Sequence, residues 1–295
     1  MSNNHPMSST DSLPPVPAQH DNAAVITISA GHKPTLAYLR ESMQASNILR
    51  VLVWRDLKVR YKQTVVGVAW AVFQPIFTLI IYSIVFGHFA KFPSAGLPYP
   101  VFVFAALLPW QYAARILNEG SSSVAGNANL VTKIYFPRLI LPMSVVFSAL
   151  VDLLIGLMVT FAVMAFYGVA PSWHIIALPL FWLWTTMVAV SVMLWFAALD
   201  VLYRDIRFVL PIISQLLLYV SPIVYPVDMI PERWRLLYYM NPFAIMADGF
   251  RWSLFGTPFK APIESVLGAG FIVIVLTIGG LRCFQRTERI FADRI

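Results

Sequence analysis

Charge and cysteine are both scarce in this 295-residue chain. Cys283 is the single cysteine, which excludes an intramolecular disulfide and any cysteine-based metal cluster. Charged residues make up 12% of the sequence, about half the share usual in soluble domains, whereas hydrophobic residues make up 59%. A soluble core does not need so much apolar surface. The composition therefore indicates a protein that crosses a membrane several times.

Several catalytic and nucleotide-binding motifs are also missing. The sequence has no GxxxxGKS or GxxxxGKT phosphate-binding loop, no HExxH, no GxSxG and no DxD pair. Its five histidines are scattered along the chain. We therefore expect a chain that is not itself an enzyme and holds no metal or cofactor of its own.

Six segments are long and apolar enough to cross a bilayer as a helix, which takes about 20 residues. They are residues 65–89, 97–117, 139–167, 175–199, 208–225 and 263–281. The sequence thus predicts an all-α membrane protein with its transmembrane domain at residues 65–295. Residues 1–33 are rich in Ser, Pro, Asn and Asp and lack the pattern of a signal peptide, so we expect a retained, disordered tail.

The net charge of +7 would fit a nucleic-acid-binding protein, but the cations gather at the ends of apolar runs. This distribution instead follows the positive-inside rule and places both termini in the cytoplasm. Residues 34–64, just before the first span, combine an apolar stripe with cations. They predict an amphipathic helix that lies in the cytoplasmic interface. We therefore expect the chain to lie in a membrane and to bind no nucleic acid.

Residues 226–256 interrupt the pattern of spans. The part at 236–256 is nearly long enough to cross, but Asp248 and Arg251 would each cost roughly 2.5–3.5 kcal/mol at the bilayer centre. The Asn241-Pro242 pair also disfavours a continuous helix. We predict a re-entrant helical hairpin before the last span.

Asp152 is the one acidic residue near the middle of a predicted span. An intramembrane carboxylate is a functional candidate, for example in a proton relay, but it can equally be paired with a neighbouring helix. Trp70, Gln74 and Pro75 in the first span leave a similar choice between a packing kink and a pore element.

Two loops carry mixed charges that suit docking to the polar surface of a partner, although a solvated loop is the alternative. The candidate docking residues are Lys133, Tyr135, Arg138, Arg204, Asp205 and Arg207. Aromatic residues gather around the re-entrant region, either as a belt at the lipid interface or as a surface on which sugar rings stack. The candidates for such a surface or for a pore or gate element are Trp70, Gln74, Tyr219, Tyr225, Trp234, Tyr238, Tyr239, Phe243 and Trp252.

Five motifs occur in a fixed order along the chain: WRDLKVRYKQTVVGVAWAVFQP, NLVTKIYFPRLILP, YRDIR, SPIVYP and YYMNPF. From about residue 49 onward, the chain resembles the permease subunit of ABC exporters for lipid-linked polysaccharides, such as O-antigen, capsule and teichoic acid. The resemblance implies a homodimer in the bacterial inner membrane, bound to two copies of a separate ATPase that carries ATP and Mg²⁺. It also implies that the lipid pyrophosphate of the substrate enters near Arg55, Lys58 and Arg60. It further implies a glycan channel lined partly by aromatic residues and capped outside by the hairpin, and the residues given above from Trp70 to Trp252 are the candidates for this channel and its outer gate.

Three other functions stay open at this point. A permease for a lipid or a drug would share the architecture and differ in substrate. A membrane enzyme that acts on polyprenyl-linked sugars would need an acidic or histidine cluster, which the sequence lacks. A proton-coupled transporter would depend on Asp152.

Overall fold

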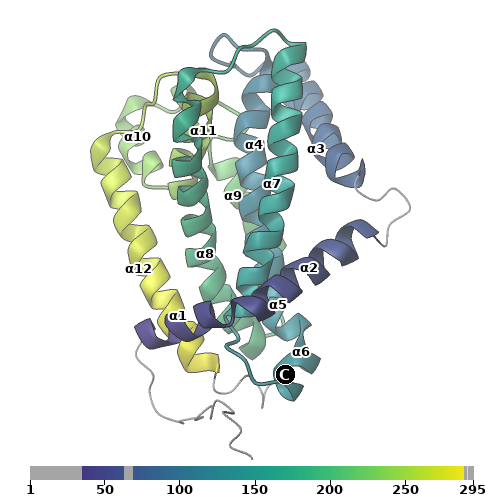
Figure 1. Cartoon of the computed structure of the whole chain (residues 1–295). Helices are drawn as coiled ribbons and strands as arrows, with labels where there is room; N and C mark the ends of the chain where they lie inside the picture. Colours follow the sequence, from purple (N-terminus) through teal and green to yellow (C-terminus); the bar gives the residue numbers. More distant parts are fainter. Residues whose placement is uncertain (1–34, 63–68, 289–290, 292–295) are drawn as a thin grey trace, which may run out of the picture. The chain divides into compact units, whose positions relative to one another are not determined.

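The computed structural model describes residues 35–62, 69–288 and 291, all of which belong to one compact unit, Pro34–Ile295 (Figure 1). The predicted disordered tail at residues 1–33 lies outside the described residues. Every described element is a helix, which confirms the all-α prediction for this part of the chain. The elements are α1 (Thr35–Gln44), α2 (Ser46–Lys62), α3 (Ala69–Tyr82), η1 (Ser83–Phe89), α4 (Tyr99–Arg115), η2 (Ile116–Gly120), α5 (Ser121–Gly126), α6 (Ala128–Lys133), α7 (Ile140–Phe166), η3 (Trp173–Ala177), α8 (Leu178–Leu202), α9 (Ile206–Val220), η4 (Val227–Met229), α10 (Glu232–Tyr239), α11 (Pro242–Phe255) and α12 (Ile263–Glu288).

The N-terminal helix predicted at residues 34–64 is in fact two helices, α1 and α2, separated at Ala45. The second of these, α2, packs along α7. Leu52 of α2 is buried against the protein, whereas Val51, Trp54 and Val59 are exposed. The junction between α2 and the first span, residues 63–68, lies outside the described residues.

Five helical stretches in the described part of the chain are long and apolar enough to cross a membrane. They are Val72–Phe89, Tyr99–Gly126, Ile140–Phe166, Trp173–Leu202 and Ile263–Glu288. The second continues well past the predicted end at residue 117. This extension includes the π-helical turn η2 and α5, and both pack on α8. The approach is close, since a Cβ atom on Gly120 would lie 2.5 Å from the Met193 sulfur.

The helix α4 lies at the centre of the packing. Of the 18 most apolar consecutive residues in its stretch, 78% are buried, compared with 11–33% for the other four stretches, and α4 contacts α3, α7, α8 and α11. The approach of α4 to α7 requires a glycine at position 156, because a Cβ atom there would lie 2.1 Å from Leu108 Cδ1. Side chains on α4 are therefore fixed by contacts with helices on several sides.

The predicted fifth span, residues 208–225, corresponds to the shorter helix α9. Its 15 residues extend about 22 Å, which is less than the roughly 30 Å of a hydrocarbon core. The helix ends at Val220, and the next residue, Ser221, has an extended conformation, as expected before Pro222. The following carbonyl of Val224 accepts a hydrogen bond of 2.7 Å from the Tyr99 hydroxyl.

The predicted hairpin region contains two helices, α10 and α11. The break between them follows from Asn241 and Pro242, since the Asn241 side chain caps α11 by accepting from the Phe243 N–H at 3.0 Å. The second helix ends at Gly256 in the left-handed conformation, which glycine adopts readily. It packs against α4 and α8, with Gly249 directly against the Phe181 ring.

Candidate functional site

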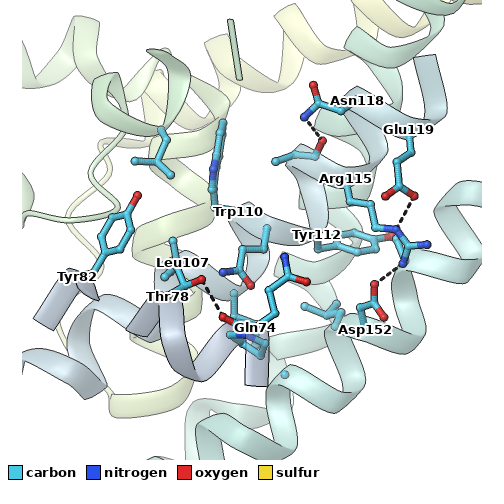
Figure 2. Close-up of a pocket in the computed structure, with 18 of the residues that line it drawn as sticks. Gln74, Thr78, Tyr82, Leu107, Trp110, Tyr112, Arg115, Asn118, Glu119 and Asp152 are labelled. Atoms are coloured by element: carbon cyan, nitrogen blue, oxygen red, sulfur yellow. Dashed lines mark hydrogen bonds and ion pairs between the residues drawn. The ribbon is translucent and has the colours of Figure 1, made fainter. Parts of the chain in front are cut away.

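A cavity of about 340 Å³, here called the membrane cavity, lies between the helices α3, α4 and α7 (Figure 2). Polar side chains line it from two helix faces. On α3, Gln74, Thr78 and Tyr82 follow one another at four-residue intervals and so share one side of the helix. Gln111 and Asn118 line it from α4 and η2. The polar side chains of these mostly apolar helices therefore line the membrane cavity.

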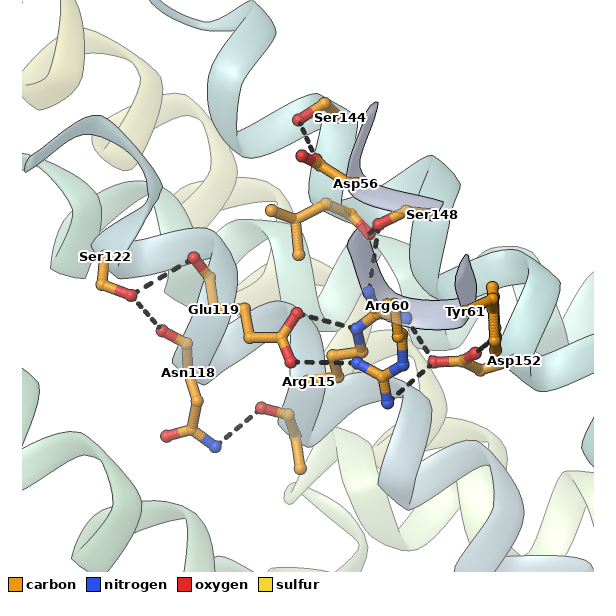
Figure 3. A network of polar contacts seen from close by, with 12 residues as sticks. Asp56, Arg60, Tyr61, Arg115, Asn118, Glu119, Ser122, Ser144, Ser148 and Asp152 are labelled. Atoms are coloured by element: carbon orange, nitrogen blue, oxygen red, sulfur yellow. Dashed lines mark hydrogen bonds and ion pairs between the residues drawn. The ribbon is translucent and has the colours of Figure 1, made fainter. Parts of the chain in front are cut away.

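Four charged residues, here called the charge cluster, lie at one side of this cavity: Arg60, Arg115, Glu119 and Asp152 (Figure 3). Arg115 donates from Nε to Glu119 Oε2 at 2.8 Å and from Nη1 to Asp152 Oδ2. Arg60 reaches the same two carboxylates, Glu119 and Asp152, at 3.3 Å each. The formal charges of the cluster cancel, and α2, α4 with η2, and α7 each contribute to it.

Two further side chains complete the surroundings of the cluster. The Tyr61 hydroxyl donates to Asp152 Oδ1, and Arg115 Nη2 donates to Ser148 Oγ at 3.3 Å. Burial raises the pKa of Tyr61, and the hydrogen bond and charge of Asp152 raise it further, so Tyr61 remains a neutral donor. Of the two interpretations of Asp152, the structure shows a carboxylate paired with neighbouring helices.

Polar contacts also attach the rest of α2 to the bundle. Arg55 Nη1 donates to Asn127 Oδ1 at 2.9 Å, and Ser144 Oγ donates to Asp56 Oδ2 at 3.1 Å. Lys58 is exposed, with its ammonium 5.3 Å from the centre of the Trp54 ring. Of the three residues predicted at the pyrophosphate site, Arg55 and Arg60 thus have protein partners.

Charged and polar groups inside spanning helices are costly, and they commonly mark the path of a substrate or ion. Here they surround a cavity and are largely paired with one another, which lowers that cost. The arrangement can hold water or hydrogen-bond the polar part of a ligand. Among the described residues, no group of three or more His, Cys, Asp or Glu side chains could hold a metal ion.

Residues 48–255 match the family model for the ABC-2 type transporter. The chain belongs to the ABC-2 type transporter family. The match extends from α2 to α11 and so includes the membrane cavity and the charge cluster.

Relatives of this transporter are similar over most of their length. One is the O-antigen export system permease protein RfbA of Klebsiella pneumoniae, 30% identical over 84% of this chain and 94% of the relative. The RfbA protein of Myxococcus xanthus is 25% identical over 87% of this chain and 98% of the relative. The polysialic acid transport protein KpsM of Escherichia coli is 22% identical over 78% and 90%.

The predicted docking loop of the transporter follows α6. Lys133 and Tyr135 are exposed, and the Arg138 guanidinium lies 5.6 Å from the Tyr135 ring centre. Behind the loop, Phe136 is buried, and the Arg138 N–H donates to Glu288 Oε1 of α12 at 3.0 Å. The loop is therefore anchored on one side and exposed on the other.

The second predicted docking loop joins α8 to α9. Arg204 and Asp205 are exposed. Arg207 instead donates from Nε and Nη2 to the two oxygens of the buried Asp200, at 3.1 and 3.2 Å. This pair holds the start of α9 to the end of α8, so Arg207 already has a structural partner.

The predicted channel residues lie in different environments in the structure. Gln74 lines the membrane cavity, whereas Trp70 and Trp234 are exposed. Tyr225 links two others, because its hydroxyl donates to the Tyr219 carbonyl at 2.9 Å and lies 2.8 Å from the Tyr238 hydroxyl.

Three other predicted channel residues pack inside the bundle. Phe243 and Tyr239 are buried, and Phe243 lies edge-on to Trp110 at 5.2 Å. Trp252 packs with His174 at 4.7 Å between ring centres. Their role in a glycan channel stays a prediction.

Two arginines proved more central than the sequence suggested. Arg115 is one of the cations at the ends of apolar runs, and the structure places it at the centre of the charge cluster; in the sequence, only its four-residue spacing from Glu119 indicates this pairing. Arg251, expected only to disfavour a span, is buried and donates to the carbonyls of Pro222 and Ile223 at 2.7 Å each. Nothing in the local sequence identifies those acceptors.

Proposed function

We propose that this chain is the transmembrane subunit of an ABC exporter that moves a lipid-linked polysaccharide, of the O-antigen or capsule type, outward across the bacterial inner membrane. The match to the ABC-2 type transporter family over residues 48–255 carries this proposal. Relatives named as O-antigen export permeases and a polysialic acid transport protein support the substrate class. The polar lining of the membrane cavity is consistent with a hydroxyl-rich substrate.

In this proposal, two copies of the chain assemble with two copies of a separate ATPase, which binds ATP and Mg²⁺. The sequence contains no phosphate-binding loop, so the energy must come from a partner. The exposed side of the loop that contains Lys133 and Tyr135 supports docking there, because cationic and aromatic groups are accessible together. Nucleotide-dependent movement of the ATPases then drives a hinge or rigid-body change in the permease.

The proposed topology has six spans and cytoplasmic termini, with α9 as the fifth span and the α10–α11 pair as a re-entrant hairpin. Lys and Arg residues at the predicted cytoplasmic ends support the orientation. The short length of α9 and the buried turn after it support a span that stops inside the protein. Non-helical backbone at membrane depth is tolerated where protein surrounds it.

The decisive test is deletion of the gene, followed by gel analysis of surface glycan and of lipid-linked glycan in the inner membrane. Loss of surface polymer with cytoplasmic accumulation of lipid-linked polymer is expected, and expression of the intact chain should reverse both. Normal surface glycan in a strain without a second exporter would refute this substrate class. A lipid or drug exporter of the same family would then be the better assignment.

A further inference from the structure

A second cavity adjoins the charge cluster. It has a volume of about 450 Å³ and lies between α2, α5 and α7. Its lining includes Arg55, Asp56, Asn127, Ser144 and Ser148, all polar. We call it the α2 cavity.

The two cavities share three lining residues: Arg60, Arg115 and Glu119. These are members of the charge cluster, and Figure 3 shows their guanidinium and carboxylate groups joined in one network with Asp152. The partition between the two cavities is therefore made of ion pairs rather than of apolar packing.

Such a partition can open at modest cost. The side chains of Arg60, Glu119 and Asp152 are 34%, 50% and 24% exposed, so water can replace the partners of Arg60 when α2 moves. Arg115 is only 10% exposed and stays paired with Glu119 and Asp152. Ion pairs open to solvent contribute little net stability, whereas separating a packed apolar wall would expose its whole surface. The π-helical turn η2, a type of distortion frequent at functional sites, carries Glu119.

Asp152 has a distinct role in this partition. It accepts from Arg60, Tyr61 and Arg115 and thereby joins α2 and α4 to α7. Its carboxylate lies between two guanidinium groups that would otherwise repel each other with only Glu119 to neutralise them. Loss of this one charge should therefore loosen the partition on the side of α2.

We propose that the charge cluster is a gate between the α2 cavity and the membrane cavity, and that Asp152 is the positioning residue that keeps it closed. The identity of the transported group rests on the proposed function. In this proposal, the polar part of the lipid-linked glycan moves between the two cavities when α2 separates from α7. Asp152 acts through Arg60 and Arg115, and the contact between Asp56 and Ser144 closes the neighbouring turn of α2.

The gate can be tested without any substrate by thiol labelling. In a Cys283→Ser background, Gln111→Cys places a thiol in the membrane cavity, and inside-out vesicles are treated with a membrane-impermeant maleimide. Adding Asp152→Asn should increase the labelling rate about tenfold. This value lies between the small effect expected for loss of an exposed charge partner and the large effect expected for loss of a buried one. Asp152→Glu, which restores the charge, should return labelling toward the slow rate.

A matched control and a cross-link complete the test. Thr132→Cys, which is exposed on α6, should label equally with and without the Asp152→Asn change, and equal rates at Gln111→Cys would overturn the gate. In a separate chain, Asp56→Cys and Ser144→Cys are joined by a short thiol cross-linker. Cross-linking should stop export and reductive release should restore it; undiminished export by the cross-linked chain would overturn the movement of α2. Because labelling requires no glycan, the gate and the proposed function can fail separately.

Discussion

Replacement of Arg251 by methionine tests how the turn after α9 is held in the bundle. The Arg251 side chain is buried, and its guanidinium donates to the carbonyls of Pro222 and Ile223 at 2.7 Å each and to the Phe102 carbonyl at 3.3 Å. It also lies 3.7 Å from the centre of the Phe102 ring. Methionine would keep much of the aliphatic volume and remove every donor.

The expected loss follows from the two short hydrogen bonds. A hydrogen bond to a charged group contributes roughly 1.5–3 kcal/mol, so the pair contributes about 3–6 kcal/mol. Removal of a buried charge recovers part of this through desolvation, which favours the lower end, about 3 kcal/mol. At roughly 2–4 °C per kcal/mol for domains of 150–250 residues, the unfolding midpoint should fall by about 6–12 °C.

The assay measures thermal unfolding of the detergent-solubilised protein. Samples are heated, and the fraction that remains folded is determined by size-exclusion chromatography. Arg235→Met is the matched control, because Arg235 is partly exposed and donates to the Ile230 carbonyl at 3.1 Å beside a solvent-exposed Glu232. Its midpoint should change by less than about 2 °C. If Arg251→Met were as stable as this control, the three carbonyls would not depend on Arg251 and the reasoning would be wrong.

The remaining predictions concern the docking loop and the packing of α4. Reversal of Lys133 and Arg138 to Glu should abolish co-purification of the ATPase while the permease dimer still assembles; an unchanged pull-down would remove the docking model. Glu288→Leu leaves the backbone N–H of Arg138 without its acceptor, at a cost of about 1 kcal/mol or roughly fivefold in docked ATPase. Glu288→Gln also removes the 3.8 Å ion pair with the Arg138 guanidinium but keeps an acceptor for this N–H, so it should bind closer to normally. Gly156→Val forces a side chain against Leu108 and should cost about 1–3 kcal/mol in thermal unfolding. Gly126→Ala meets no atom within 4 Å and should not lower the midpoint, so equal midpoints for the two variants would refute this packing argument.

Much of the fold could be predicted because apolar length alone decides whether a helix can cross a bilayer. The predicted segments at residues 139–167 and 263–281 begin within a residue of α7 and α12, respectively. The break between α10 and α11 was also predictable, because Asn241 and Pro242 act locally on the backbone. The long extension of the second span to Gly126 was not, since its polar end is stabilised by contact with α8 rather than by its own composition.

The candidate site was predictable only in part. The sequence identified Arg60, Gln74 and Asp152 as unusual polar residues near or within spans, because such residues are rare there. It assigned Arg60 to the pyrophosphate entry and Gln74 to the glycan channel or its gate, and both line the same cavity.

By itself, the sequence determined that this chain is a helical membrane protein, where most of its helices lie and which family it belongs to, since these follow from composition and from ordered local motifs. Tertiary structure alone decided which charges meet. Arg60 pairs with Glu119 and Asp152. Arg251 donates to the carbonyls of Phe102 and Pro222. Both sets of contacts form because helix packing brings positions that are distant in sequence within hydrogen-bonding distance. A buried charge is tolerable only with such partners, and their identity depends on how neighbouring helices are aligned rather than on adjacent residues.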